Sequence, residues 1–195
     1  MHTSSIAPWI AAPETSVADL PALTFYEGAK DTTRWTYGEL YARVDATARW
    51  LAAKQGIEAG AVVGLLSPNE PSVPVFLLAL LRLGATILPL NINADAADGV
   101  FALRHARARY LITSASLSPR AEQLASAVER VIGFDSPEGT WPSVPDLPSH
   151  AADHPAIVLY TSGTTGNSKG VVLTQRNVLE NARLMARRLE LRQTT

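Results

Sequence analysis

AIVLYTSGTTGNSKGVVLTQRN, residues 156–177, joins two apolar runs through a polar loop. The runs AIVLY and GVVLT are short and rich in β-branched residues, as is typical of buried strands. The residues between them are mainly hydroxyl side chains and glycines, followed by one lysine, and such a composition is typical of loops. The segment therefore predicts two strands connected by a loop that consists mainly of hydroxyl side chains and glycines and ends in a lysine.

The loop can surround an anion with hydrogen-bond donors. Gly163 and Gly166 can adopt positive φ angles and let a ligand approach the backbone closely. Successive turn residues can aim several N–H groups at one point, the hydroxyls add donors, and Lys169 adds a mobile ammonium group. These features favour a phosphate chain as the ligand. Composition alone leaves open a second interpretation, a solvated turn of serine, threonine and glycine.

Two better-known loop motifs do not fit the sequence. A Walker A loop requires glycine directly before the lysine and a helix after it, whereas Ser168 precedes Lys169 and the run GVVLT follows. A nucleophile elbow requires Gly-x-Ser-x-Gly, but Tyr160 and Thr164 occupy the glycine positions around Ser162. The segment therefore predicts neither a Walker site nor a serine hydrolase.

Outside this segment, helix-like and strand-like runs alternate along the chain. Thr36 followed by Glu39 predicts a capping box at the start of the first helix, and Pro71 and Pro74 fit the first turn of an apolar, buried helix. The alternation predicts an α/β fold, a mostly parallel sheet with helices on both faces. Strands are predicted at 61–69, 85–91, 110–115, 131–134, 156–160 and 170–174, helices at 36–56, 70–84, 94–109, 118–130 and 175–192, and a proline-rich loop at 135–149.

Bulk composition excludes several classes of function. The chain has 195 residues, of which 47% are apolar and 18% charged, so it can bury a core. A net charge of −1 and the absence of a basic stripe argue against nucleic acid as a partner. No cysteine is present, which excludes disulfides, zinc–thiolate sites and a thiol nucleophile. The apolar runs are too short to span a membrane and the start lacks a signal-peptide pattern, so we expect a cytoplasmic protein.

The loop segment YTSGTTGNSKGVVLTQRN resembles the phosphate-binding signature of the adenylate-forming superfamily. That superfamily includes acyl-CoA and aryl-CoA synthetases, adenylation domains of peptide synthetases, and luciferases. Other stretches resemble the family in the same order along the chain: LTFYEGAKDTTRWTYGELYARVDATARWLA, GIEAGAVVGLLSPNEPSVPVFLLALLRLGATILPLN and HARARYLITSA. The resemblance implies that residues 1–195 are an incomplete N-terminal portion of the large domain of such an enzyme, and that the rest of the enzyme is absent.

The resemblance also implies a site. The residues that would wrap the β- and γ-phosphates of ATP are Thr161, Ser162, Gly163, Thr164, Thr165, Gly166 and Lys169. Lys169 is the implied catalytic residue, because an ammonium group stabilises the charge that develops on departing pyrophosphate. The family implies Mg²⁺ as a further cofactor, and coenzyme A at a site outside this chain; no metal ligand is predicted within it. The family usually has proline where this chain has Ser168, so we expect a more mobile loop.

The resemblance predicts part of an ATP-dependent carboxylic acid–CoA ligase, which forms an acyl-adenylate and then a thioester. Its partners would be ATP, a carboxylic acid, coenzyme A or another thiol acceptor, and the missing C-terminal part; the chain alone is predicted to be inactive. Two alternatives remain open: a non-catalytic fragment or complementing subunit that acts in assembly, and an adenylation domain of a peptide synthetase.

The histidines and tryptophans are predicted to have no direct role in catalysis. His150 and His154 are four residues apart but lack a third ligand nearby, so solvated side chains are expected rather than a zinc site. His105 lies in an arginine-rich run and is predicted to be at the surface. Packing rather than base stacking is predicted for the tryptophans, which are Trp9, Trp35, Trp50 and Trp141.

Overall fold

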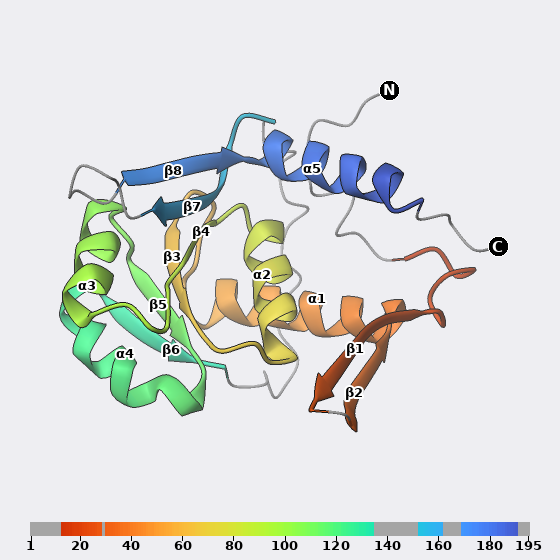
Figure 1. Ribbon diagram of the computed structural model, residues 1–195, viewed down its shortest axis with the longest axis horizontal. Helices are drawn as coiled ribbons and strands as arrows, with labels where there is room; N and C mark the ends of the chain where they lie inside the picture. Colours follow the sequence, from red (N-terminus) through yellow and green to blue (C-terminus); the bar gives the residue numbers. More distant parts are fainter. Residues whose placement is uncertain (1–12, 29, 135–151, 162–168, 191–195) are drawn as a thin grey trace.

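The computed structural model describes residues 13–28, 30–134, 152–161 and 169–190, which form a six-stranded sheet, a separate hairpin and covering helices (Figure 1). The strands are β1 (Pro21–Glu27), β2 (Lys30–Thr36), β3 (Val62–Leu66), β4 (Thr86–Pro89), β5 (Tyr110–Thr113), β6 (Arg130–Gly133), β7 (Pro155–Thr161) and β8 (Lys169–Thr174). The α-helices are α1 (Tyr37–Ala53), α2 (Ser72–Arg82), α3 (Ala96–His105), α4 (Ser118–Leu124) and α5 (Gln175–Arg188). The predicted proline-rich loop, 135–149, lies outside the described residues.

The large sheet has the strand order β6-β5-β3-β4-β7-β8. Neighbouring strands from β6 to β7 run parallel, and β8 at the edge is antiparallel to β7. This arrangement confirms the mostly parallel sheet that the alternation of helices and strands predicted. Both strands that flank the polar loop are present, and they are next to each other in the sheet.

Helices cover both faces of the sheet and enclose two apolar clusters. On one face α1, α2 and α5 contribute residues such as Leu51, Leu80 and Leu179 to the larger cluster. On the other face α3 and α4 contribute Leu103 and Leu124 to the smaller one. Each fully buried leucine stabilises the fold by about 1.5–3 kcal/mol. In Figure 1, α3 and α4 lie together on one side of the sheet, and α1 and α2 lie on the other.

Local sequence signals place the starts of α1 and α5. The side chain of Thr36 accepts a hydrogen bond from the backbone N–H of Glu39, whose carboxylate accepts one from the N–H of Thr36, which confirms the predicted capping box. Thr174 and Asn177 make the same reciprocal contacts at α5. These side chains satisfy N–H groups that a helix start leaves without partners.

The predicted ends of three helices were wrong, because the chain leaves the helical conformation earlier than the sequence pattern predicts. The helix predicted at 94–109 ends at His105, and Arg107 takes a positive φ of 56° before the chain joins β5. The helix predicted at 118–130 ends at Leu124 and continues as a 3₁₀ turn, Ala125–Ala127, before β6. The last helix ends at Arg188 rather than at 192, and Glu190 has a φ of 50°. The periodicity of apolar side chains along the sequence does not predict these turns.

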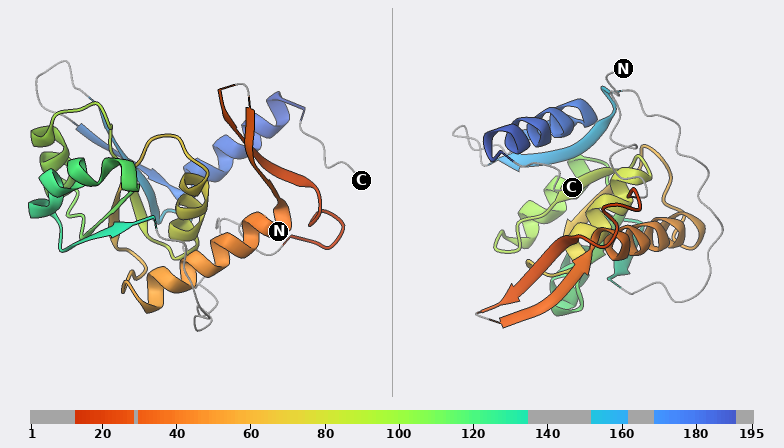
Figure 2. Two further views of the ribbon diagram at one scale, coloured as in Figure 1. Left: turned by 90° about the horizontal axis from the view of Figure 1, so that it is seen from below. Right: turned by 90° about the vertical axis from the view of Figure 1, so that its right-hand side faces the viewer.

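The hairpin of β1 and β2 projects away from the large sheet, as both views in Figure 2 show. It is connected directly to α1, since Thr36 ends β2 and caps the helix. The hairpin therefore lies remote from the ends of β7 and β8 that flank the polar loop.

Candidate functional site

Thr161 and Lys169 mark the two ends of the loop predicted to bind phosphate. Thr161 is the last residue of β7 and Lys169 is the first residue of β8, and the two are directly paired across the antiparallel strands. Directly opposite residues project from the same face of a sheet, with Cβ atoms about 4.5–5.5 Å apart. Both residues are exposed. The fold thus brings one hydroxyl and one ammonium group to the same face at the mouth of the loop.

The remaining predicted phosphate ligands lie outside the described residues, and their role stays a prediction. They are Ser162, Gly163, Thr164, Thr165 and Gly166.

A cavity of about 450 Å³ adjoins the end of β7. It lies at the carboxyl ends of three strands, where its lining includes Leu66 of β3, Pro89 of β4 and Thr161 of β7. The start of α3 and one side of α4 complete its wall. The chain order reverses here, because β4 lies on one side of β3 and β5 on the other. In open α/β sheets ligands bind at such a reversal, outside the carboxyl ends of the strands.

The charged groups that line this cavity do not suit a triphosphate. Asp95 and Asp98 contribute carboxylates, and Arg120 contributes a guanidinium group. That guanidinium group already donates hydrogen bonds to the carbonyl of Ala94 and, over 2.9 Å, to Oε1 of Gln123. Two carboxylates beside an occupied cation repel phosphate oxygens. The cavity is therefore poorly suited to phosphate groups.

An aromatic cluster, consisting of Phe101, His105 and Tyr160, lies where β7 meets the loop. Nδ1 of His105 is 2.6 Å from the hydroxyl of Tyr160, and the tautomer of His105 decides which atom donates. The Phe101 ring stacks on His105 with centroids 5.4 Å apart and meets Tyr160 edge-on at 6.2 Å. Partial burial raises the pKa of Tyr160, so its hydroxyl stays protonated at neutral pH.

No pattern in the sequence predicted this cluster. His105 is at the surface, as predicted, but no partner was predicted for its side chain. Phe101 and His105 are four residues apart on one helix, and this spacing is a signal that the two rings are neighbours. Their contact with Tyr160 joins residues 55 positions apart and leaves no local signal.

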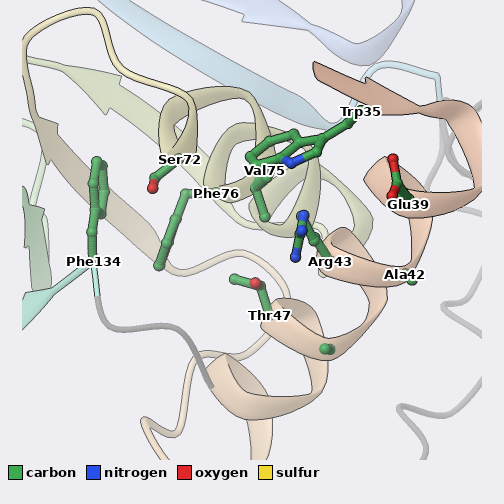
Figure 3. Close-up of a pocket in the computed structure, with 10 residues that line it drawn as sticks. Trp35, Glu39, Ala42, Arg43, Thr47, Ser72, Val75, Phe76 and Phe134 are labelled. Atoms are coloured by element: carbon green, nitrogen blue, oxygen red, sulfur yellow. The ribbon is translucent and has the colours of Figure 1, made fainter. Parts of the chain in front are cut away.

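A second hollow, of about 380 Å³, lies between α1 and α2 (Figure 3). Trp35, Phe76 and Phe134 line it, and the guanidinium group of Arg43 lies 4.7 Å from the centre of the Trp35 ring. Trp35 packs against the larger apolar cluster and Trp50 lies within it, so the predicted packing role of these two tryptophans is confirmed. The described ends of the polar loop, at β7 and β8, do not contribute to the lining of this hollow.

The side chain of His154, which was predicted to be solvated, is partly buried in the segment that leads into β7. Its Nε2 lies 3.0 Å from the carbonyl oxygen of Gly84. Its predicted neighbour His150 lies outside the described residues. Across the described part of the chain, no group of three or more histidines and carboxylates is close enough together to hold a metal ion. Nor does any described helix have the length and apolar character needed to cross a membrane.

Comparison with known proteins gives consistent matches. A sequence profile of the family described as AMP-binding enzyme matches residues 11–194. The chain is 30% identical to Sulfoacetate–CoA ligase of Cupriavidus necator over 194 positions, which cover 92% of this chain and 34% of that enzyme. It is also 30% identical to Cyclosporin synthetase simA of Tolypocladium inflatum over 150 residues, which cover 76% of this chain and 1% of that protein.

A similar fold is found among solved structures. A fatty acyl CoA synthetase from Mycobacterium tuberculosis superposes with a TM-score of 0.71 at 26% identity, over 88% of this chain and 35% of that one. The chain therefore spans about a third of the length of the sulfoacetate ligase and of the fatty acyl CoA synthetase that it matches.

Proposed function

The chain belongs to the family of AMP-binding enzymes, and on that basis we propose that it is part of an ATP-dependent carboxylic acid–CoA ligase. Within that enzyme it forms the N-terminal portion of the large domain and supplies the phosphate-binding loop. The loop comprises Thr161, residues 162–168 and Lys169.

One observation carries the proposal. Thr161 and Lys169 are paired residues at the ends of β7 and β8, on the same face of the sheet. The intervening segment, SGTTGNS, therefore begins and ends between a hydroxyl donor and a cation. Such a frame suits a chain of phosphates, which needs several donors and a positive charge within a few ångströms.

The proposed reaction has two steps. A carboxylate oxygen of the acid attacks the α-phosphorus of ATP, the bond from that phosphorus to the bridging oxygen breaks, and pyrophosphate leaves with the bonding electrons. A thiol then attacks the acyl carbon and AMP leaves. Lys169 acts in the first step, because negative charge builds on the departing pyrophosphate and a cation held nearby lowers the energy of the transition state.

Magnesium accompanies the triphosphate in this proposal. Mg²⁺ is commonly held by substrate phosphates and one or two carboxylates. The ion would supply further neutralisation of phosphate charge beside Lys169.

Pyrophosphate exchange tests the proposal. The enzyme that contains this chain is incubated with ATP, labelled pyrophosphate and a panel of carboxylic acids. We expect label to enter ATP in the presence of at least one acid. A subsequent incubation with coenzyme A should release AMP and a thioester, whereas an adenylation domain of a peptide synthetase would form the adenylate without using coenzyme A. The test includes the outcome without coenzyme A because the chain is similar to Cyclosporin synthetase simA.

A second candidate function is assembly, in which the chain acts as a non-catalytic complementing subunit. One observation favours it: β8 is an edge strand with exposed apolar side chains on both faces, Val171 at 47% and Val172 at 53% exposure. Exposed edges of this kind pair readily with another polypeptide. Exchange activity of the chain alone would refute this function. Activity that appears only with a second polypeptide and is unchanged by Lys169→Ala would support it, since a non-catalytic subunit contributes no phosphate ligand.

A further inference from the structure

The ring of Tyr160 contacts both strands that carry the loop. Tyr160 precedes Thr161 on β7 and is paired across the sheet with Gly170, which follows Lys169 on β8. A Cβ atom on Gly170 would lie 3.2 Å from Cζ and 3.4 Å from the hydroxyl oxygen of Tyr160. Glycine at this position therefore allows the tyrosine ring to lie closely against β8. The ring thus lies one residue away from each end of the loop.

The aromatic cluster connects these strand ends to α3. His105 is in the last turn of α3, and its contact with the Tyr160 hydroxyl joins this helix to β7 independently of the backbone hydrogen bonds of the sheet. α3 also forms part of the wall of the cavity whose rim includes Thr161. In Figure 1, α3 lies beside the ends of β7 and β8 where the loop begins.

The hydroxyl of Tyr160 contributes a hydrogen bond to His105 in addition to the packing of the ring. Phe101 is 45% exposed and His105 is also exposed, so burial of these two rings contributes little to global stability. The tyrosine ring itself packs against the smaller apolar cluster, and a phenylalanine ring would pack equally well there. The hydrogen bond between Tyr160 and His105 therefore acts locally, on the orientation of the strand ends.

We propose that the aromatic cluster of Phe101, His105 and Tyr160 positions the two ends of the phosphate-binding loop, so that Thr161 and Lys169 face the same phosphates. The inference rests on the proposed function of the loop. His105 and Tyr160 are positioning residues: they act through Thr161 and Lys169 and do not contact the nucleotide. Fixed donors bind and stabilise charge better than mobile donors, since no ordering is needed at the moment of reaction.

The test uses the enzyme that contains this chain, with two substitutions that remove the hydrogen bond while keeping a ring: Tyr160→Phe and His105→Phe. Hydrogen exchange is followed by mass spectrometry on peptides that cover residues 155–174, together with thermal unfolding and calorimetric titration with ATP. Loss of one hydrogen bond should raise exchange at the loop ends by about 2- to 12-fold and weaken ATP binding by a similar factor. The unfolding temperature should stay close to that of the wild type.

Two further variants serve as controls. Tyr26→Phe makes the same chemical change at an exposed tyrosine of the remote hairpin and should alter neither exchange at the loop nor ATP binding. His105→Asn keeps a hydrogen-bonding atom near the position of Nδ1 and should restore much of the protection. Such rescue would not occur if the imidazole ring mattered only as packing.

The outcomes test the positioning role of the cluster separately from the proposed function of the loop. Unchanged exchange in both phenylalanine variants would overturn the positioning role, as would faster exchange with unaltered ATP affinity or a large fall in unfolding temperature. If the wild-type enzyme that contains this chain binds no ATP, while exchange still rises at the loop ends in the variants, the structural link between the cluster and the loop ends stands and the proposed function of the loop fails.

Discussion

Lys169 occupies the first position of β8, opposite Thr161, and is the cation that we propose contacts the phosphates. Substitution by alanine in the complete enzyme removes one charged hydrogen-bond partner, which is worth about 1.5–3 kcal/mol. We therefore expect adenylation efficiency, measured as kcat/KM in pyrophosphate exchange, to fall by about 10- to 150-fold.

Lys54→Ala is the matched control, because Lys54 is also exposed but lies at the end of α1, away from the loop. It should leave the exchange rate unchanged. Equal rates for the Lys169→Ala enzyme and the wild type would show that the ammonium group does not contact the phosphates.

Gly166→Val addresses the backbone of the loop rather than its charge. A valine side chain disfavours positive φ and blocks close approach of a phosphate to the backbone. We expect at least as large a loss of adenylation as for Lys169→Ala, with an unfolding temperature close to that of the wild type. A fully active Gly166→Val enzyme would exclude a close approach of the ligand at this residue.

Residue-level prediction succeeded where the information is local. The capping box of Thr36 and Glu39 spans three residues, so its sequence signature alone predicts the hydrogen bonds that the structure contains. The contact between His105 and Tyr160 depends on how α3 packs beside β7. No short-range pattern encodes it, and it could be found only once the fold was known. The likeness of residues 160–177 to a family signature predicted a phosphate site, but only Thr161 and Lys169 of that site lie within the described residues.

At the level of elements, α5 follows β8 without a connecting loop, so its N-cap also fixes the end of the strand. Thr174→Ala removes the side chain that accepts the hydrogen bond from the N–H of Asn177. We expect a loss of about 1 kcal/mol in the free energy of unfolding, measured by urea denaturation. Thr174→Ser keeps the hydroxyl and should lose much less, and equal losses in both variants would rule out capping as the cause.

The starts of β5 and β6 are joined by an ion pair that should respond to pH. Nε and Nη2 of Arg109 each donate to a carboxylate oxygen of Glu129 over 3.0 Å. The hydrogen bond from Arg109 holds the pKa of Glu129 below its ordinary value of 4.5. A depressed pKa stabilises the folded state at pH values above 4.5, and this stabilisation is lost as the pH falls through the lower, folded-state value.

Glu129→Gln should therefore remove part of the acid sensitivity of the fold. We expect the unfolding temperature of this variant to fall less steeply than that of the wild type below pH 4.5, and the difference to be small because both side chains are exposed. Glu122→Gln, on α4, is a suitable control, since it changes the same chemical group at another site. Parallel pH profiles for Glu129→Gln and the wild type would contradict the role of this ion pair.

The order and type of the elements from α1 onward were predictable, and their ends were less so. Buried β-branched runs such as VVGLL and YLIT have no competing interpretation in a chain that alternates strands with amphipathic segments. The ends of α3 and α5 are followed by residues with positive φ, at Arg107 and Glu190, a conformation that stops a helix and that side-chain periodicity does not encode. The antiparallel direction of β8 follows from the shortness of the loop before it, since a parallel strand needs a longer crossover.

For the molecule as a whole, the two edges of the large sheet differ. β6 forms one edge and β8 the other. Beyond β8, the exposed residues Leu184 and Met185 of α5, and Leu189 just after it, extend the apolar surface. Exposed apolar surface of this extent is typical of interaction sites, so we expect a complementing polypeptide to bind on this side of the molecule.

Complementation tests that arrangement directly. We expect the chain alone to show no pyrophosphate exchange, and activity to appear when a polypeptide corresponding to the uncovered part of the ligase relative is added. Val172→Lys places a charge on the β8 edge, so it should lower the restored activity about tenfold or more, equivalent to ~1.4 kcal/mol of association free energy.

Val131→Lys places the same charge on the β6 edge, where Val131 is 39% exposed, and should have little effect because that edge would not be an interface. Equal inhibition by the two substitutions would indicate general damage to the sheet, and inhibition by Val131→Lys alone would place the interface at β6. Only a selective effect of Val172→Lys fits a catalytic unit completed across β8, immediately beside the strand end that carries Lys169.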